Sequence, residues 1–260
     1  MVPADVVTAW AITHPWPART QVEQDLLLSQ AICEIANHPY LGAELVFRGG
    51  TALHKLHMAA PYRYSEDLDY VRSTSSGIAP LTRALTEVGE RLGYVVRTRI
   101  SEHPKVYWRC TSASGTPLRI KVEVNTHETS PALTPLHIEH AVDTEWWSGS
   151  AAVRTFQPPE LVATKVRALY QRSKGRDVFD LWLAIHGLGI DPDAIIDAFA
   201  PYRPGGWTPK LAEQNLRRKL ADPTYGADLL QLVANPPADF AITDAAELLL
   251  DRLIRRVPPV

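Results

Sequence analysis

The chain has 260 residues, of which 45% are hydrophobic and 22% charged, so it is long enough to bury a sizeable core. Its formal net charge of -2 excludes a uniformly basic nucleic-acid binder, while leaving room for a local basic patch. Cys33 and Cys110 fit neither a zinc spacing nor a disulfide framework, and no segment is apolar enough to span a bilayer. Together with an N-terminus unlike a signal sequence, these features predict a cytoplasmic protein with no membrane partner.

Helical and strand patterns alternate in the first part of the chain. Apolar residues recur at helical spacing over residues 20–36 and predict a helix. Residues 44–48 predict a short strand that stops at a pair of glycines, and residues 51–58 then return to helical spacing. Residues 64–71 alternate between apolar and polar side chains. The expected order is therefore helix, strand, glycine turn, helix and strand.

The same mixture continues to the middle of the chain. Residues 81–92 predict an amphipathic helix, residues 94–100 a strand, and a further strand is expected to begin at Val106. Residues 118–125 alternate strictly, which places Glu123 on the polar face of a strand. Residues 127–147 have only a weak pattern, so we expect a long connection there.

A double proline, Pro158-Pro159, precedes a run of helical patterns and marks the expected domain boundary. Strands thus come first and helices afterwards, which favours an α+β fold over a regularly alternating doubly wound sheet. We expect one domain over residues 1–157 and a mainly helical domain over residues 158–260. The expected C-terminal helices cover residues 160–172, 177–186, 192–200, 209–220 and 245–256.

Acidic side chains on the two expected strands suggest a metal site. Asp67 and Asp69 are two residues apart on one strand, so their carboxylates leave the same face. With Glu123 from a neighbouring strand, they could hold one or two Mg²⁺ ions, which favour carboxylate and phosphate oxygens. Gly49-Gly50-Thr51 ends a strand and opens a helix, where backbone N–H groups suit phosphates. Each feature alone is more often a solvated face or an ordinary turn.

The ordered set of features resembles the DNA polymerase β-like nucleotidyltransferases, although the interval from Thr51 to Glu66 is longer than usual there. Particular stretches of the sequence point to a narrower family. Residues 47–56 read FRGGTALHKL and residues 63–70 read RYSEDLDY, and both are similar to blocks of the AbiEii/AbiGii toxin family. A third similar block, ELVATKVRAL followed by RSKGRDVFDL, lies within residues 160–181. Three blocks in the family's order make coincidence improbable.

This resemblance implies a nucleotidyltransferase-type mixed β-sheet with flanking helices, whose helical C-terminal domain completes the active-site cleft. It implies an enzyme in which an acceptor hydroxyl attacks the α-phosphate of a nucleoside triphosphate. Two Mg²⁺ ions are expected, with Mn²⁺ as an alternative. The implied metal ligands are Asp67, Asp69 and Glu123; the implied nucleotide contacts are Gly49, Gly50, Thr51, Ser65, Lys165, Arg176 and Asp177.

Two of the C-terminal residues have a catalytic role in this scheme. Lys165 lies on the expected helix 160–172, whose turn could direct its ammonium toward the phosphates. The resemblance points to the same residue. Asp180 is expected to contact Lys165 or the incoming nucleotide. For Asp177, capping of the helix or pairing with Arg176 is as good an explanation as catalysis.

The resemblance also implies an RNA acceptor, first of all the 3′ end of tRNA, with arrested translation as the outcome and a cognate antitoxin as partner. A basic RNA surface is compatible with the cations that follow residue 216. These cations are Arg217, Arg218, Lys219, Arg252, Arg255 and Arg256. The alternatives are an antibiotic or small-molecule nucleotidyltransferase, and a catalytically inactive binding protein of the same fold.

Overall fold

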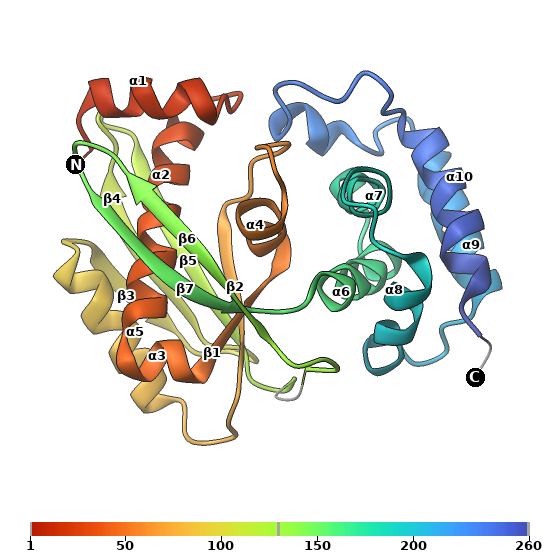
Figure 1. Cartoon of the computed structure of the whole chain (residues 1–260), viewed down its shortest axis with the longest axis horizontal. Coiled ribbons are helices and arrows are strands. Elements are labelled where there is room, and N and C mark those ends of the chain that lie inside the picture. The colour runs from red at the N-terminus through yellow and green to blue at the C-terminus, as the bar shows by residue number, and fades with distance from the viewer. Residues whose placement is uncertain (1, 129–130, 259–260) are drawn as a thin grey trace. The chain divides into compact units, whose positions relative to one another are not determined.

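The computed structural model describes residues 2–128 and 131–258. Contacts within the chain divide it into two compact units, Met1–Phe156 and Gln157–Val260. The ribbon in Figure 1 shows a strand-containing first unit and a helical second unit. Among the residues described, no helix combines the length and the apolar character that a membrane crossing requires.

The first unit contains a seven-stranded mixed sheet with the order β3-β4-β5-β2-β1-β7-β6. Strands β2 and β5 pair in parallel, as do β1 and β7, and the other neighbours are antiparallel. The mixed α+β fold expected from the sequence is therefore confirmed. The strands are β1 (Leu45–Arg48), β2 (Asp67–Arg72), β3 (Val95–Arg99), β4 (Lys105–Thr111), β5 (Pro117–Asn125), β6 (Leu136–Asp143) and β7 (Ser148–Thr155).

One long helix, α2, packs against this sheet and contacts β5, β6 and β7. Its residues Leu26, Leu28 and Ile32 are fully buried, and each such side chain contributes roughly 1.5–3 kcal/mol through removal from water. Leu28, Ile32 and the buried Ile35 follow one another at intervals of four and three residues, the spacing of one helical face, which explains why the 20–36 segment is helical. The helices of the unit are α1 (Ala4–Thr13), α2 (Arg19–Asn37), α3 (Pro39–Glu44), α4 (Gly49–Ala52), the π-helical turn η1 (Leu53–His57) and α5 (Ala79–Arg91).

The structure differs from the sequence-based expectation in several places, and α1, α3 and β7 lie where no helix or strand was expected. The expected connection at residues 127–147 contains β6, whose pattern is weak because most of its side chains are at least partly exposed and Val142 alone is buried. Residues 64–66 precede β2 instead of extending it. The helix expected after the glycines begins at Gly49 itself and ends as a π-helical turn.

The second unit is built from helices throughout the part that the structure describes. Its core includes Leu161, Leu181 and Leu250, which are fully buried. The buried carboxylate of Glu160 accepts a hydrogen bond from the hydroxyl of Tyr202, which satisfies a polar group inside this core. The elements are α6 (Pro158–Gln171), α7 (Gly175–Trp182), η2 (Leu183–Gly187), α8 (Pro192–Phe199), η3 (Ala200–Tyr202), α9 (Pro209–Leu220), η4 (Ala227–Gln231), α10 (Ile242–Arg252) and η5 (Ile254–Arg256).

Candidate active site

The glycine turn between β1 and α4 brings the backbone close to β2. Gly49 has a φ of +85°, a conformation that other residues rarely adopt. A Cβ atom added there would lie 2.5 Å from Oδ2 of Asp69. Glycine is therefore required at this position, both for the turn and for the approach to Asp69.

Thr51 and Ser65 lie on the other side of the same turn. The hydroxyl of Thr51 lies 2.5 Å from the carbonyl oxygen of Asp67, to which it donates, and 2.9 Å from the hydroxyl of Ser65. Thr51 is buried, and its hydrogen bond to Asp67 connects α4 to the start of β2. Ser65 is half-buried and stands just before the strand.

Parallel pairing of β2 with β5 sets the acidic residues side by side. Asp67 is opposite Lys121 in the register, and Asp69 is opposite Glu123. The ammonium of Lys121 lies 2.8 Å from Asp67 and 3.1 Å from Glu123, and Lys105 on β4 lies 3.2 Å from Glu123. The structure thus brings together all three carboxylates that the sequence singled out, with two lysines that the sequence analysis did not assign to the site.

The pKa shifts in this cluster follow from burial and from the neighbouring charges. Burial raises the pKa of Asp69, and the charge of Asp67 raises it further, against the opposing effects of Lys121 and Arg48. Burial also acts to raise the pKa of Glu123, but hydrogen bonds and charges from Lys121 and Lys105 outweigh it and lower the pKa. Asp69 is therefore the acid whose ionised form is least well compensated by the protein.

A divalent cation would compensate the negative charge at Asp69. Asp67 and Asp69 present hard carboxylate oxygens from one face of a strand, which is the donor type that Mg²⁺ prefers. A cation beside them would relieve the unfavourable charge that raises the pKa of Asp69. These two residues would hold the ion.

A second group of possible ligands lies just before β4 and just after β5, next to the paired residues Lys105 and Glu123. Side chains of Glu102, His103 and His127 have ligand atoms within 4.8 Å of one another. The two imidazole rings are in edge contact, with centroids 5.1 Å apart. Exposed acidic groups are common without an ion, and we assign no metal to this cluster.

Three charged residues of the second unit, Lys165, Asp177 and Asp180, are buried and ion-paired. Lys165 on α6 lies 2.9 Å from Asp180 on α7, and both side chains are buried. Asp177 accepts two hydrogen bonds from Arg172, at 2.7 and 2.6 Å, whereas pairing with Arg176 was one of the alternatives that the sequence left open. The backbone N–H of Arg176 is 3.4 Å from Asp228. The carboxylate of Asp177 is therefore held in place by Arg172.

Four of the six cations expected to form an RNA surface, Arg217, Lys219, Arg255 and Arg256, have partners in this unit. Arg217 pairs with Glu213 and Glu247, and Arg255 pairs with Glu213 as well. Lys219 points inward and donates to backbone carbonyls of α6 and of the residue after it. These pairs neutralise much of the charge, so they give no support to a basic surface at this place.

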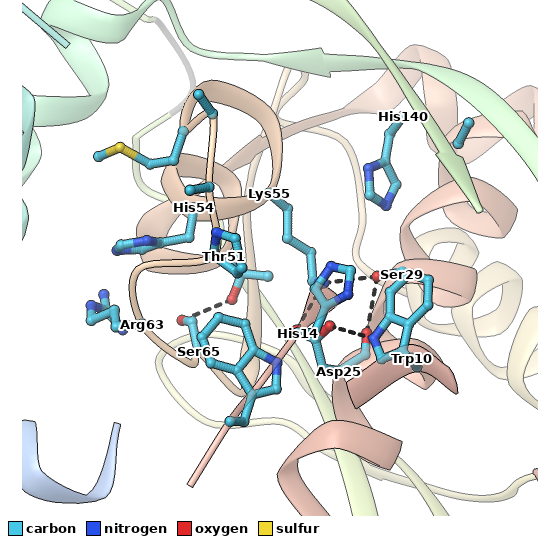
Figure 2. A pocket seen from close by; sticks show the side chains of 16 residues that line it. Trp10, His14, Asp25, Ser29, Thr51, His54, Lys55, Arg63, Ser65 and His140 are labelled. Atoms are coloured by element: carbon cyan, nitrogen blue, oxygen red, sulfur yellow. Dashed lines mark hydrogen bonds and ion pairs between the residues drawn. The ribbon is translucent and has the colours of Figure 1, made fainter. Parts of the chain in front are cut away.

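A polar cavity of about 260 Å³ adjoins Thr51 and Ser65 in the first unit. Figure 2 shows that Trp10, His14, Asp25 and Lys55 also line it. The buried carboxylate of Asp25 lies 2.8 Å from the ammonium of Lys55 and accepts a hydrogen bond of 2.9 Å from the indole of Trp10. No local sequence pattern predicts this cavity, because its walls come from segments far apart in the chain.

Comparisons with known proteins place this geometry in context. The family described as "Nucleotidyl transferase AbiEii toxin, Type IV TA system" matches residues 30–251. The chain is similar in structure to MenT4, nucleotidyltransferase toxin Rv2826c from Mycobacterium tuberculosis H37Rv, with a TM-score of 0.63, 16% identity, and coverage of 99% of this chain and 91% of that one. An antigenic nucleotidyltransferase-like protein from Paracoccidioides brasiliensis gives a TM-score of 0.40 at 18% identity, with coverage of 88% and 92%. No curated protein matches the chain.

Proposed function

Because this chain belongs to the AbiEii family of nucleotidyltransferase toxins of type IV toxin–antitoxin systems, we propose that it transfers a nucleoside monophosphate from an NTP to RNA. The proposed acceptor is the 3′ end of tRNA, and the proposed outcome is arrest of translation and growth. Both substrates occur in the cytoplasm, where we place the activity. Family membership also implies an antitoxin partner.

The observation that carries the proposal is the pair Asp67 and Asp69 beside the glycine turn. A Cβ atom at Gly49 would clash with Oδ2 of Asp69, so the turn lies directly against this carboxylate. We propose that Asp67 and Asp69 hold Mg²⁺, which when bound would neutralise phosphate charge and activate the attacking hydroxyl. Mn²⁺ offers the same chemistry with similar ligands.

The other residues would orient and neutralise the triphosphate. We assign Gly49 and Gly50 to the phosphate chain, because a turn without side chains lets backbone N–H groups approach phosphate oxygens. Ser65 would add a hydroxyl at the same end, and the buried hydroxyl of Thr51 would keep Ser65 and Asp67 in position. Positioning and charge neutralisation are the main sources of rate in phosphoryl chemistry.

We assign four residues of the second unit to the same reaction. Lys165 would balance the charge of the leaving pyrophosphate, and Asp180 would orient the Lys165 ammonium through their 2.9 Å ion pair. Asp177 and Arg176 would contribute to nucleotide binding through the turn before α7, with Asp177 held by Arg172. The proposal for these four residues rests on the family resemblance and on this pairing.

Incubation with each α-labelled NTP, Mg²⁺ and either tRNA or a panel of small hydroxyl compounds tests the proposed function. We expect label on intact tRNA. The label should be lost when EDTA is present, and also when the 3′ hydroxyl of the tRNA is blocked. Label on a small acceptor alone would contradict the RNA assignment. Absence of any labelled product with all four NTPs and both metals would contradict the enzyme assignment and favour a binding protein.

A further inference from the structure

Lys121 is the central cation of the acidic cluster in the first unit. It lies on β5 directly opposite Asp67 and two residues before Glu123, so its side chain shares their face of the sheet. Its ammonium is 2.8 Å from Oδ2 of Asp67 and 3.1 Å from Oε2 of Glu123. This is the bridging position that a second divalent ion shared by Asp67 and Glu123 would need.

Glu123 has little capacity left for such an ion. One of its oxygens, Oε2, is taken by Lys121, and the other, Oε1, lies 3.2 Å from the ammonium of Lys105. Both lysines lie on strands of the same sheet, and their side chains are only 22% and 29% exposed. They are therefore held near Glu123 by the sheet and are less mobile than lysines on a loop would be.

Asp69 is in the opposite situation. Among the residues that the structure describes, its carboxylate has no hydrogen bond or ion pair, although it lies near the charge of Asp67. Asp67 uses Oδ2 for Lys121 and keeps Oδ1 outside that pair. The oxygens available to a metal thus belong to Asp69 and to one side of Asp67.

We propose that the site binds a single divalent ion on Asp67 and Asp69, and that the ammonium of Lys121 takes the place of a second ion between Asp67 and Glu123. This inference rests on the proposed function. It makes Lys121 a positioning residue that fixes the Asp67 carboxylate, and Glu123 a residue that holds Lys121. The sequence alone led to the opposite expectation, a second ion shared with Glu123, and the number of bound ions distinguishes the two.

The charge balance supports one ion. Three carboxylates face two ammonium groups in the cluster, which leaves one negative charge without compensation by these lysines. A single divalent ion satisfies that charge and still attracts a triphosphate. A second ion would have to sit against the Lys121 ammonium, where like charges at short distance repel strongly.

Counting Mn²⁺ ions tests the proposal without any measurement of turnover. The full chain is titrated with Mn²⁺ in the presence of a non-hydrolysable NTP analogue, and free Mn²⁺ is followed by electron paramagnetic resonance, with the ions held by the analogue alone subtracted. We expect one ion per chain for the wild type and for Lys121→Arg. We expect two for Lys121→Met, because Asp67 and Glu123 lose the cation between them.

Lys105→Met is the matched control, because it removes an ammonium from Glu123 but leaves Lys121 in place. We expect it to bind one ion, and circular dichroism with thermal melting establishes that each variant is folded. Two ions in the wild type, or one in Lys121→Met, would overturn the inference while leaving the proposed function intact. No bound ion in any variant would instead contradict the metal-dependent function itself.

Discussion

The chain carries two groups of ionised side chains that differ in how completely they are paired. In the first unit, Asp67 and Glu123 are 35% and 22% exposed and share Lys121, while Asp69 lies near charged groups but forms no ion pair among the described residues. In the second unit, Asp180 and Asp177 are 0% exposed, each with its own cation. The first group leaves negative charge that a cation can neutralise, whereas each buried carboxylate of the second group is neutralised by an internal ion pair. The spacing of acids and bases in a sequence therefore does not reveal how completely each is paired.

The largest difference between the groups should appear in activity. Asp67→Asn removes a proposed metal ligand from a partly exposed position, so we expect transfer to tRNA to fall by at least about 10³-fold, equivalent to about 4 kcal/mol. The fold should be retained because no core side chain is lost. Initial rates and thermal melting measure the two effects. Asp143→Asn, at an exposed position on β6, is the control and should keep full activity. Normal transfer by the Asp67 variant would remove the first unit's cluster from the mechanism.

The second group should respond mainly in stability. Asp180→Asn leaves the buried Lys165 ammonium without its carboxylate, which typically costs about 3–5 kcal/mol in the free energy of unfolding. The double variant Lys165→Met/Asp180→Leu removes both charges and should recover most of that loss. Denaturant unfolding measures all three proteins. If the double variant regains stability but not transfer, Lys165 has a role in the reaction; recovery of both would assign the pair to structure alone.

The smallest effect should be a gain in stability at Asp69. Since the pKa of Asp69 is raised in the folded chain, its stabilising contribution is present below the unfolded pKa and is lost as pH rises through the folded pKa. At neutral pH the ionised carboxylate is a net cost. Asp69→Asn should therefore increase the free energy of unfolding at pH 7 in metal-free buffer by about 0.5–2 kcal/mol. Melting curves from pH 3 to 8 should show the gain disappear at low pH; a constant difference would argue against this origin.

The sequence predicted the parts of the site that depend on short-range periodicity. Alternation over residues 118–125 placed Glu123 and Lys121 on one face of a strand, and the spacing of Asp67 and Asp69 did the same for β2. What it did not predict is the register between those strands, because 54 residues separate the paired Asp67 and Lys121, and no local pattern encodes which residues face each other. The role of Lys121 follows only from that register.

Other omissions have the same physical origin. Strand β6 was missed because its exposed residues give little contrast between its two faces. The pairing of Asp25 with Lys55 was missed because it joins α2 to η1 across a cavity and leaves no periodic trace in either segment. Buried polar contacts between distant segments are decided by tertiary packing, whereas strand and helix patterns are already present in the order of residues.

The close approach of Gly49 to Asp69 has a consequence for cells that carry this chain. Any codon change that puts a side chain at position 49 would displace Asp69 and strain the backbone, because Gly49 has a positive φ. If the chain arrests growth, such a change would abolish its toxicity. Survivors of forced expression without the antitoxin should therefore include missense alleles at this codon that still yield full-length protein. Such alleles would supply harmless versions of the chain for work in living cultures.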